Sequence, residues 1–167
     1  MSNLKINAID LIIFDFDGVL TNNSVYLDHA GNELVKCSRS DGLAFDVLRK
    51  LNKSVFILSS EKNQVVSARA QKLKVEVIQS IDDKVDAISS ILDRSNSSLD
   101  RTLYVGNDLN DYKVMELCRY TACPSDSHQL IKDISNFNLT SKGGEGVARE
   151  LVEDIFNIDF LKTLYKK

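Results

Sequence analysis

Residues 12–21 read Ile-Ile-Phe-Asp-Phe-Asp-Gly-Val-Leu-Thr, and the rest of the chain is best interpreted from this stretch. The apolar run that ends at Phe14 is typical of a buried parallel strand. Two carboxylates, Asp15 and Asp17, follow at once, and Gly18 indicates that the chain is already turning. Because open α/β sheets bind ligands at the carboxyl ends of their strands, Asp15 is expected at such a site. Two crowded acids repel each other, which predicts a cation between them; the plainer alternative is a strand followed by an ordinary Asp-Gly turn.

The composition restricts the class of protein. A length of 167 residues predicts one domain over 1–167, and 43% hydrophobic and 27% charged residues are ordinary for a globular chain. The net charge of −3 offers no basic face for nucleic acid. The apolar run at 11–14 is too short to span a membrane, and the first residues do not resemble a signal peptide. Cys37, Cys118 and Cys123 form no CxxC pair, which predicts free thiols in a reducing, cytoplasmic setting.

Strand-like and helix-like segments alternate along the chain, which favours an α/β fold: a Rossmann-like parallel sheet with helices on both faces. Strands are expected at 9–14, 54–58, 75–78, 102–105, 120–122 and 137–140. Helices are expected at 42–51, at 63–73, from Asp82 or Asp83 to about 92, after 106–111 to about 118, at 127–132, at 147–156 and from there to 165. Ser40 or Asp41 is expected to cap the first of these helices.

Two further segments stand outside this alternation. Residues 25–28 and 33–36 flank a turn, which predicts a β-hairpin over about 24–36 that projects from the sheet edge carrying the site. Such a hairpin serves as a lid, as an oligomer contact or simply as surface structure. The C-terminal tail, about 142–167, opens with the glycine-rich turn KGGEG.

Clusters of polar residues follow three of the predicted strands. The clusters are Asp15 and Asp17, then Ser59, Ser60 and Glu61, then Asn107, Asp108 and Asp111. Lys84, at the start of a helix that follows a fourth strand, can join them. Because the carboxyl ends of parallel strands lie at one edge of a sheet, these side chains are expected to share one site.

A site of carboxylates, a hydroxyl, an amine and a hard cation suits phosphoryl transfer. Asp15 is expected to attack phosphorus and form an aspartyl-phosphate, and Asp17 to protonate the leaving alkoxide and then activate water. The hydroxyl of Ser59 and the ammonium of Lys84 would hold phosphate oxygens. Mg²⁺ keeps several waters and needs few protein ligands, for which Asp15, the Asp17 carbonyl and Asn107 would serve.

Four segments resemble the signatures of the haloacid dehalogenase-like phosphatases: DFDGVLT at 15–21, the strand that ends in Ser59, then Lys84, and GNDLND at 106–111. A short chain with a hairpin in place of a cap domain resembles the subgroup that acts on sugar-acid phosphates. That subgroup includes 3-deoxy-manno-octulosonate 8-phosphate and nonulosonate 9-phosphate phosphatases. The resemblance implies a Mg²⁺-dependent homotetramer in which hairpins pack into a barrel and neighbouring chains complete each site. It extends to a domain attached to some acylneuraminate cytidylyltransferases, so such an enzyme is a candidate partner.

Residues 58–61, LSSE, resemble the second motif of sialic-acid-type members, which implies a sialic-acid-like nonulosonate 9-phosphate as substrate. Glu61, Arg69 and Lys72 fall where a related nonulosonate phosphatase binds its substrate. Arg and Lys can pair a sugar carboxylate, whereas the alternative is that both line an exposed helix face. Ser60 replaces a usual glycine and is expected to narrow the phosphate site or to add a hydroxyl.

The fourth motif departs from the family pattern because Asn107 stands where many members have Asp. An amide can bind Mg²⁺ but contributes less charge, so metal affinity or turnover could suffer. Asp108 and Asp111 are expected behind the metal ligands, with Asp111 anchoring the motif or Lys84. The segment GGEGVARE at 143–150 matches a family tail, which implies closure over a site.

Three competing functions remain at this point. An octulosonate 8-phosphate phosphatase differs only in substrate, and Glu61 argues mildly against it. A catalytically weak assembly domain that partners a cytidylyltransferase is suggested by Asn107. A response-regulator receiver is disfavoured, because a receiver has no second carboxylate placed like Asp17.

Overall fold

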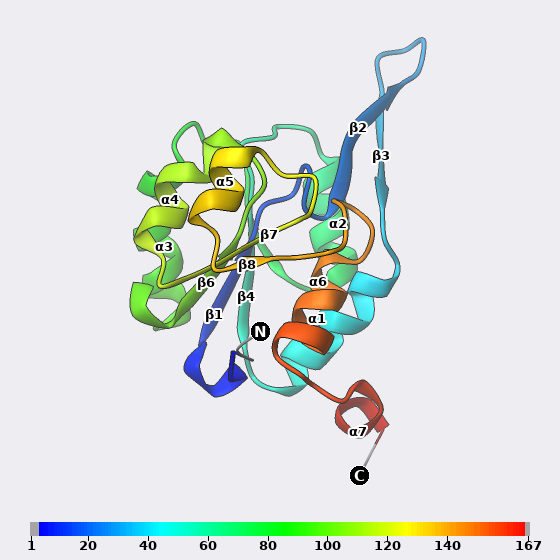
Figure 1. Cartoon of the computed structure of the whole chain (residues 1–167). Coiled ribbons are helices and arrows are strands. Elements are labelled where there is room, and N and C mark those ends of the chain that lie inside the picture. Colours follow the sequence, from blue (N-terminus) through cyan, green and yellow to red (C-terminus); the bar gives the residue numbers. More distant parts are fainter. Residues whose placement is uncertain (1–3, 166–167) are drawn as a thin grey trace.

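The computed structural model describes residues 4–165, and its centre is a parallel sheet of six strands in the order β5-β4-β1-β6-β7-β8 (Figure 1). The strands are β1 (Leu11–Phe14), β4 (Ser54–Leu58), β5 (Glu76–Ile78), β6 (Thr102–Val105), β7 (Tyr120–Cys123) and β8 (Phe137–Asn138). All six predicted strands are present, although β8 is shorter than expected. No helix within residues 4–165 combines the length and the apolar character that crossing a bilayer requires.

Strand β1 lies between β4 and β6 and has buried side chains on both faces. Phe14 pairs with Ile57 of β4 and with Val105 of β6, so the three strands end at the same level. Ile12 and Phe14 enter one hydrophobic core, and the alternate residues of β1 enter the other. A strand buried on both faces explains the uninterrupted apolar run in the sequence.

Helices cover both faces of the sheet, as the alternation predicted. On one face lie α1 (Ser40–Lys50), α2 (Val65–Leu73) and α6 (Val147–Glu150); on the other lie α3 (Lys84–Ser95), α4 (Tyr112–Leu117) and α5 (Gln129–Ile134) (Figure 1). A short 3₁₀ helix, η3 (Leu109–Asp111), precedes α4. The Rossmann-like α/β prediction is therefore confirmed.

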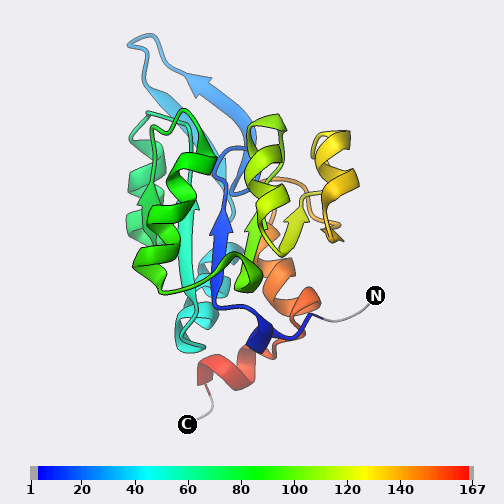
Figure 2. The ribbon, with the colours of Figure 1, turned by 90° about the vertical axis from the view of Figure 1, so that its left-hand side faces the viewer.

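The predicted hairpin projects well beyond the sheet and its helices (Figure 2). It consists of β2 (Thr21–Leu27) and β3 (Glu33–Cys37), so it begins earlier than expected, directly after the loop that contains Asp17. Its pairing is irregular between Thr21 and Val25, where Asn23 has a φ of +59°. The apolar side chains on it are exposed: Val25 53%, Tyr26 60%, Leu27 67% and Leu34 63%.

The cap predicted for α1 is wrong. Arg39 precedes the helix and makes no side-chain cap, while the carboxylate of Asp41 is fully buried. Asp41 Oδ1 accepts a hydrogen bond of 3.2 Å from the backbone N–H of Arg149, in the first turn of α6. Asp41 therefore caps a helix that lies more than 100 residues further along the chain. Burial raises the pKa of its carboxyl to about 6.

The C-terminal segment packs on the α1 face. Helix α6 continues as a turn of π-helix, η4 (Leu151–Ile155), and α7 (Phe160–Tyr165) follows. Their apolar residues, including Leu151, Val152 and Phe160, join the core beneath α1. The predicted helix at 147–156 thus corresponds to α6 and η4 together.

Candidate active site

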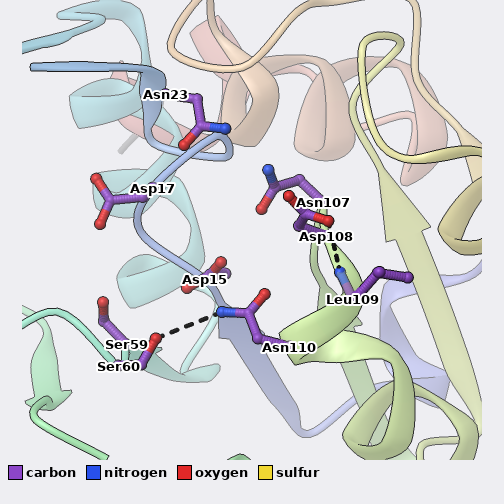
Figure 3. A pocket seen from close by; sticks show the side chains of 9 residues that line it. All are labelled: Asp15, Asp17, Asn23, Ser59, Ser60, Asn107, Asp108, Leu109 and Asn110. Atoms are coloured by element: carbon purple, nitrogen blue, oxygen red, sulfur yellow. Dashed lines mark hydrogen bonds between the residues drawn. The ribbon is translucent and has the colours of Figure 1, made fainter.

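The loops after β1, β4 and β6 surround a pocket of about 280 Å³ at the carboxyl end of the sheet (Figure 3). Its lining residues are Asp15, Asp17, Asn23, Ser59, Ser60, Asn107, Asp108, Leu109 and Asn110. All three predicted polar clusters contribute side chains to this lining. The convergence that parallel strands predicted is therefore present in the structure.

At the base of the pocket lies a buried array of charges. Lys84 Nζ is 2.7 Å from Asp15 Oδ1 and 2.6 Å from Asp111 Oδ1, and all three residues are at most 3% exposed. Asp111 also accepts hydrogen bonds from the Tyr104 hydroxyl (2.8 Å) and from the Asn107 N–H (2.9 Å). Asp111 thus contacts both Lys84 and the fourth motif, the two roles that the sequence offered as alternatives.

The charges of this array depend on one another. Burial and the neighbouring Asp111 carboxylate raise the pKa of Asp15, and the Lys84 ammonium opposes that rise. Burial alone would lower the pKa of Lys84, but the two carboxylates beside it raise that pKa above its ordinary value. Lys84 is therefore a permanent cation at neutral pH. Its position follows from the sequence, because Asp83 caps α3 by accepting from the Val85 N–H (2.9 Å).

Asp17 lies on the loop that connects β1 to the hairpin. Thr21 Oγ1 is 3.4 Å from Asp17 Oδ1 and accepts hydrogen bonds of 3.2 Å from the N–H groups of Gly18 and Asn23. Partial burial raises the pKa of the Asp17 carboxyl. A carboxyl group that holds its proton more firmly than usual is suited to donate that proton to a leaving group.

Glycine is required at position 18 for two reasons. Its φ of +76° is a conformation that other residues rarely adopt, and an added Cβ would lie 2.0 Å from the side-chain amide of Asn107. The absence of a side chain therefore lets Asn107 approach the backbone of the Asp17 loop.

Three groups that can bind a metal lie close together: the Asp15 carboxylate, the Asp17 carbonyl and the Asn107 side chain. The side-chain atom of Asn107 that faces the site lies 2.8 Å from the Asp17 carbonyl oxygen and 3.2 Å from Asp15 Oδ2. An amide nitrogen there would donate to both oxygens, whereas an amide oxygen would complete a set of three acceptors. Oxygen ligands about 2.1 Å from an octahedral Mg²⁺ are about 3 Å apart when adjacent, which matches these separations.

This ligand set differs from a cluster of ionisable side chains. Among residues 4–165, no group of three or more His, Cys, Asp or Glu side chains could hold a metal ion. The candidate set instead combines one carboxylate with a backbone carbonyl and an amide, as the sequence predicted. Such a hard-oxygen set fits Mg²⁺.

The loop after β4 supplies hydroxyl groups to the pocket. Ser59 is 2% exposed, and its Oγ accepts from the N–H of Glu61 (3.1 Å). Ser60 Oγ is 3.4 Å from Asn110 Nδ2, across the pocket from the fourth motif (Figure 3). Ser59 and Ser60 therefore both line the pocket, as the sequence predicted.

The other three residues expected around the substrate do not line this pocket. Glu61 Oε1 accepts from the N–H groups of Lys62 (2.6 Å) and Asn63 (2.7 Å), so it caps its own turn before α2. Arg69 Nη2 donates to the carbonyl oxygen of Ser38 (2.6 Å) at the base of the hairpin. Lys72 is exposed near the end of α2. Their role in substrate binding stays a prediction.

The fourth motif contributes more to the pocket than the sequence analysis assigned to it. Asp108 is exposed in the pocket and forms a capping box with Asp111 at η3. Leu109 and Asn110 also line the pocket, although neither was singled out. Asn23 was missed as well; the only signal was its place in an Asn-Asn pair where the chain turns into the hairpin.

Comparisons with known proteins identify the family of the chain. A family model described as haloacid dehalogenase-like hydrolase matches residues 43–151. The 3-deoxy-D-manno-octulosonate 8-phosphate phosphatase of Salmonella typhi is 30% identical over 150 residues, which cover 89% of this chain and 80% of that protein. The corresponding protein of Yersinia pestis is 27% identical over 146 residues, which cover 87% of this chain and 78% of that protein.

Solved structures of proteins from the same family resemble this chain closely. A haloacid dehalogenase family hydrolase from Streptomyces avermitilis has a TM-score of 0.91 and 34% identity, with 95% of this chain and 91% of that chain covered. The octulosonate 8-phosphate phosphatase of Moraxella catarrhalis, solved with magnesium, phosphate and its sugar acid, has a TM-score of 0.86 and 25% identity, with 91% of this chain and 88% of that chain covered.

The chain belongs to the haloacid dehalogenase-like hydrolases. Within that family it falls in the subgroup of the 3-deoxy-manno-octulosonate 8-phosphate phosphatases. This confirms the expected enzyme class, a phosphatase, and the expected cofactor, Mg²⁺.

Proposed function

We propose that this enzyme hydrolyses a phosphorylated 3-deoxy sugar acid of the octulosonate 8-phosphate type, through an aspartyl-phosphate on Asp15. The observation that carries the proposal is the buried Lys84, held between Asp15 and Asp111 below a pocket whose oxygen ligands suit Mg²⁺.

The substrate in this proposal is the alternative of the sequence analysis rather than its main expectation. The relatives are named for octulosonate 8-phosphate, and a sialic-acid-like nonulosonate 9-phosphate has no support from them. Glu61, which favoured the nine-carbon substrate, uses one carboxylate oxygen to cap its own turn. The nonulosonate ester therefore becomes a competitor in the test.

The reaction would proceed in two steps. In the first, Asp15 attacks phosphorus, the bond from phosphorus to the sugar oxygen breaks, and Asp17 gives its proton to the departing alkoxide. In the second, Asp17 takes a proton from water as that water attacks the phosphorus, which releases inorganic phosphate and restores Asp15. Lys84 and the Ser59 hydroxyl would bind phosphate oxygens throughout.

The charge of the substrate makes the cation necessary. Mg²⁺, held by Asp15, the Asp17 carbonyl and Asn107, would offset the repulsion between a phosphate dianion and the attacking carboxylate. Asn107 supplies no charge to this set, so the metal affinity is expected to be lower than with an aspartate at position 107.

Phosphate release from octulosonate 8-phosphate, a nonulosonate 9-phosphate and p-nitrophenyl phosphate tests the proposal. We expect a preference for octulosonate 8-phosphate that disappears with EDTA and in Asp15→Asn. A preference for the nonulosonate ester would restore the nine-carbon substrate. No release from any ester by a folded oligomer would favour an assembly domain that partners a cytidylyltransferase. Asn107, in place of the usual aspartate, would then account for the missing activity.

We also propose that the chain, a single domain over 1–167, assembles as a cytoplasmic homotetramer through its hairpins. The exposed apolar side chains of β2 and β3 support this, because a surface of this kind is typical of a contact between chains.

The described pocket lining contains no Lys or Arg that could pair a sugar carboxylate. A neighbouring chain would supply that cation. The three free cysteines suit a reducing compartment.

A further inference from the structure

The glycine-rich turn at 142–146 lies against the loop that contains Asp17, outside the pocket lining. The N–H of Gly144 donates to the carbonyl oxygen of Val19 (3.0 Å). A Cβ added to Gly143 would lie 2.3 Å from the Gly18 carbonyl oxygen and 2.8 Å from that of Thr21. One added to Gly144 would lie 2.6 Å from the Thr21 carbonyl carbon. The two backbones are therefore in direct contact, which only glycine permits.

Hydrogen bonds from other parts of the fold fix this turn in place. The N–H of Gly143 donates to Asp126 Oδ1 (3.0 Å) in the loop after β7. Glu150 accepts hydrogen bonds from the N–H groups of Thr140 and Ser141 (2.7 Å each), and Asp41 accepts from that of Arg149. The turn is thus held in place on both sides where it contacts the loop that contains Asp17.

Two residues, Gly18 and Thr21, connect this contact to Asp17. Gly18, whose carbonyl oxygen meets Gly143, directly follows Asp17 in the chain. Thr21, whose backbone meets both glycines, places its Oγ1 3.4 Å from Asp17 Oδ1. Asp15 is held by different groups, namely Lys84 and the N–H of Phe16.

We propose that the Gly143–Gly144 turn is a positioning element for Asp17, which sets the place of the proton donor without touching substrate. The proposal rests on the general-acid role proposed above for Asp17. It differs from closure of a tail over the site, because the turn contacts the catalytic loop from outside the pocket.

A displaced general acid has a distinctive chemical consequence. An alkoxide leaving group must be protonated as it departs, whereas p-nitrophenolate is a much weaker base and departs without this help. The later activation of water by Asp17 is common to both esters and affects kcat for both, whereas kcat/KM reports only the steps through departure of the leaving group. A defect confined to Asp17 therefore lowers kcat/KM for a sugar phosphate far more than kcat/KM for p-nitrophenyl phosphate. General loss of folded enzyme would lower both rates equally. Because loss of the oligomer would also weaken hydrolysis of the sugar acid alone, the variants are compared at the wild-type molar mass measured by light scattering.

The test compares Gly143→Ala and Gly144→Ala with two matched controls. Gly42→Ala, in α1 and outside the hairpin, is the matched control for Gly143→Ala, because its Cβ meets nothing within 4 Å. Glu145→Ala changes the same turn and removes only the exposed ion pair with Lys36. For both test variants we expect kcat/KM for octulosonate 8-phosphate to fall about tenfold or more, and kcat/KM for p-nitrophenyl phosphate less than about threefold. Both controls should keep the wild-type ratio of the two rates.

Asp17→Asn separates failure of this inference from failure of the proposed function. If Asp17→Asn lowers kcat/KM for both esters equally, Asp17 is not the general acid and the proposed mechanism is wrong. If Asp17→Asn lowers kcat/KM selectively for the sugar phosphate and Gly143→Ala does not, the positioning role is wrong. Should the glycine variants fail to fold, Thr21→Val, which removes the hydroxyl beside Asp17, must show the same selective loss, and an unchanged ratio there would overturn the inference.

Discussion

The base of the pocket and the projecting hairpin show opposite relations between side chains and solvent. At the base, Asp15, Lys84 and Asp111 are at most 3% exposed, and every charge faces a partner from the same chain. On the hairpin, Tyr26 and Leu27 are more than half exposed and face no part of their own chain's core. The groups proposed for the phosphate chemistry thus all come from one chain, whereas the exposed apolar side chains of the hairpin support the proposed contact with a second chain.

The largest expected effect comes from breaking the buried ion array. Lys84→Met leaves the Asp15 and Asp111 carboxylates close together without their cation. We expect a loss of about 3–5 kcal/mol in the free energy of unfolding, together with loss of turnover. Urea denaturation measures the first effect, with Lys62→Met, a change at an exposed lysine before α2, as the control. A loss of less than about 1 kcal/mol would show that the array contributes little to stability.

The second prediction tests the other side of the comparison. Leu27→Asp places a charge on the exposed apolar face of the hairpin, so we expect the molar mass from light scattering to fall from four chains to one. Hydrolysis of p-nitrophenyl phosphate should change less than about threefold, because the phosphate site lies within one chain, while hydrolysis of the sugar acid should fall about tenfold or more. Leu117→Asp on α4 is the control. A tetramer that survives Leu27→Asp would contradict the hairpin interface.

A smaller effect is expected at Asp41, a buried carboxylate that differs from Asp15 because it forms no ion pair within residues 4–165. Its pKa is about 6 in the folded chain against an ordinary value of 3.8, so the folded state retains this proton to higher pH than the unfolded state. The wild type therefore loses stability relative to Asp41→Asn as pH rises from about 4 to about 6. Because asparagine keeps an acceptor for Arg149, we expect Asp41→Asn to be more stable above pH 6 by about 1–2 kcal/mol.

Thermal or urea unfolding between pH 4 and pH 8 measures this difference. The two proteins should converge in stability near pH 4. A constant offset at every pH would show that titration of Asp41 is not its cause.

The smallest effect is expected at Glu61. Because its carboxylate caps the turn before α2, Glu61→Gln keeps an acceptor for those N–H groups and should change kcat/KM on either sugar acid by less than about threefold. Glu61→Ala should cost about 0.5–1 kcal/mol of stability from the lost hydrogen bonds. A strong change in preference between the two sugar acids in Glu61→Gln would show that Glu61 contacts the substrate and sets that preference.

The sequence predicted the sheet and the centre of the site because both follow from local patterns. Each strand was a short apolar run, and parallel strands must end at one edge, so Asp15, Ser59 and Asn107 had to meet. Lys84 could be placed because Asp83 caps the helix that it opens.

The contacts that were missed depend on long-range packing. Asp41 looked like a local cap, but it is the approach of α6 that brings the Arg149 N–H to it. Arg69 contacts Ser38, 31 residues away, and no spacing in the sequence indicates that pair. The contact between Gly143 and Gly18 likewise depends on how the last segment returns to the first loop.

The most direct measurement is chemical trapping of the covalent intermediate. Enzyme quenched during turnover of octulosonate 8-phosphate with Mg²⁺ is treated with borohydride, which reduces an aspartyl-phosphate to homoserine, and the peptide that contains position 15 is analysed by mass spectrometry. We expect homoserine at position 15, dependent on substrate and Mg²⁺, and none at position 17. Continued hydrolysis with unmodified Asp15, or full activity in Asp15→Asn, would contradict the proposed mechanism.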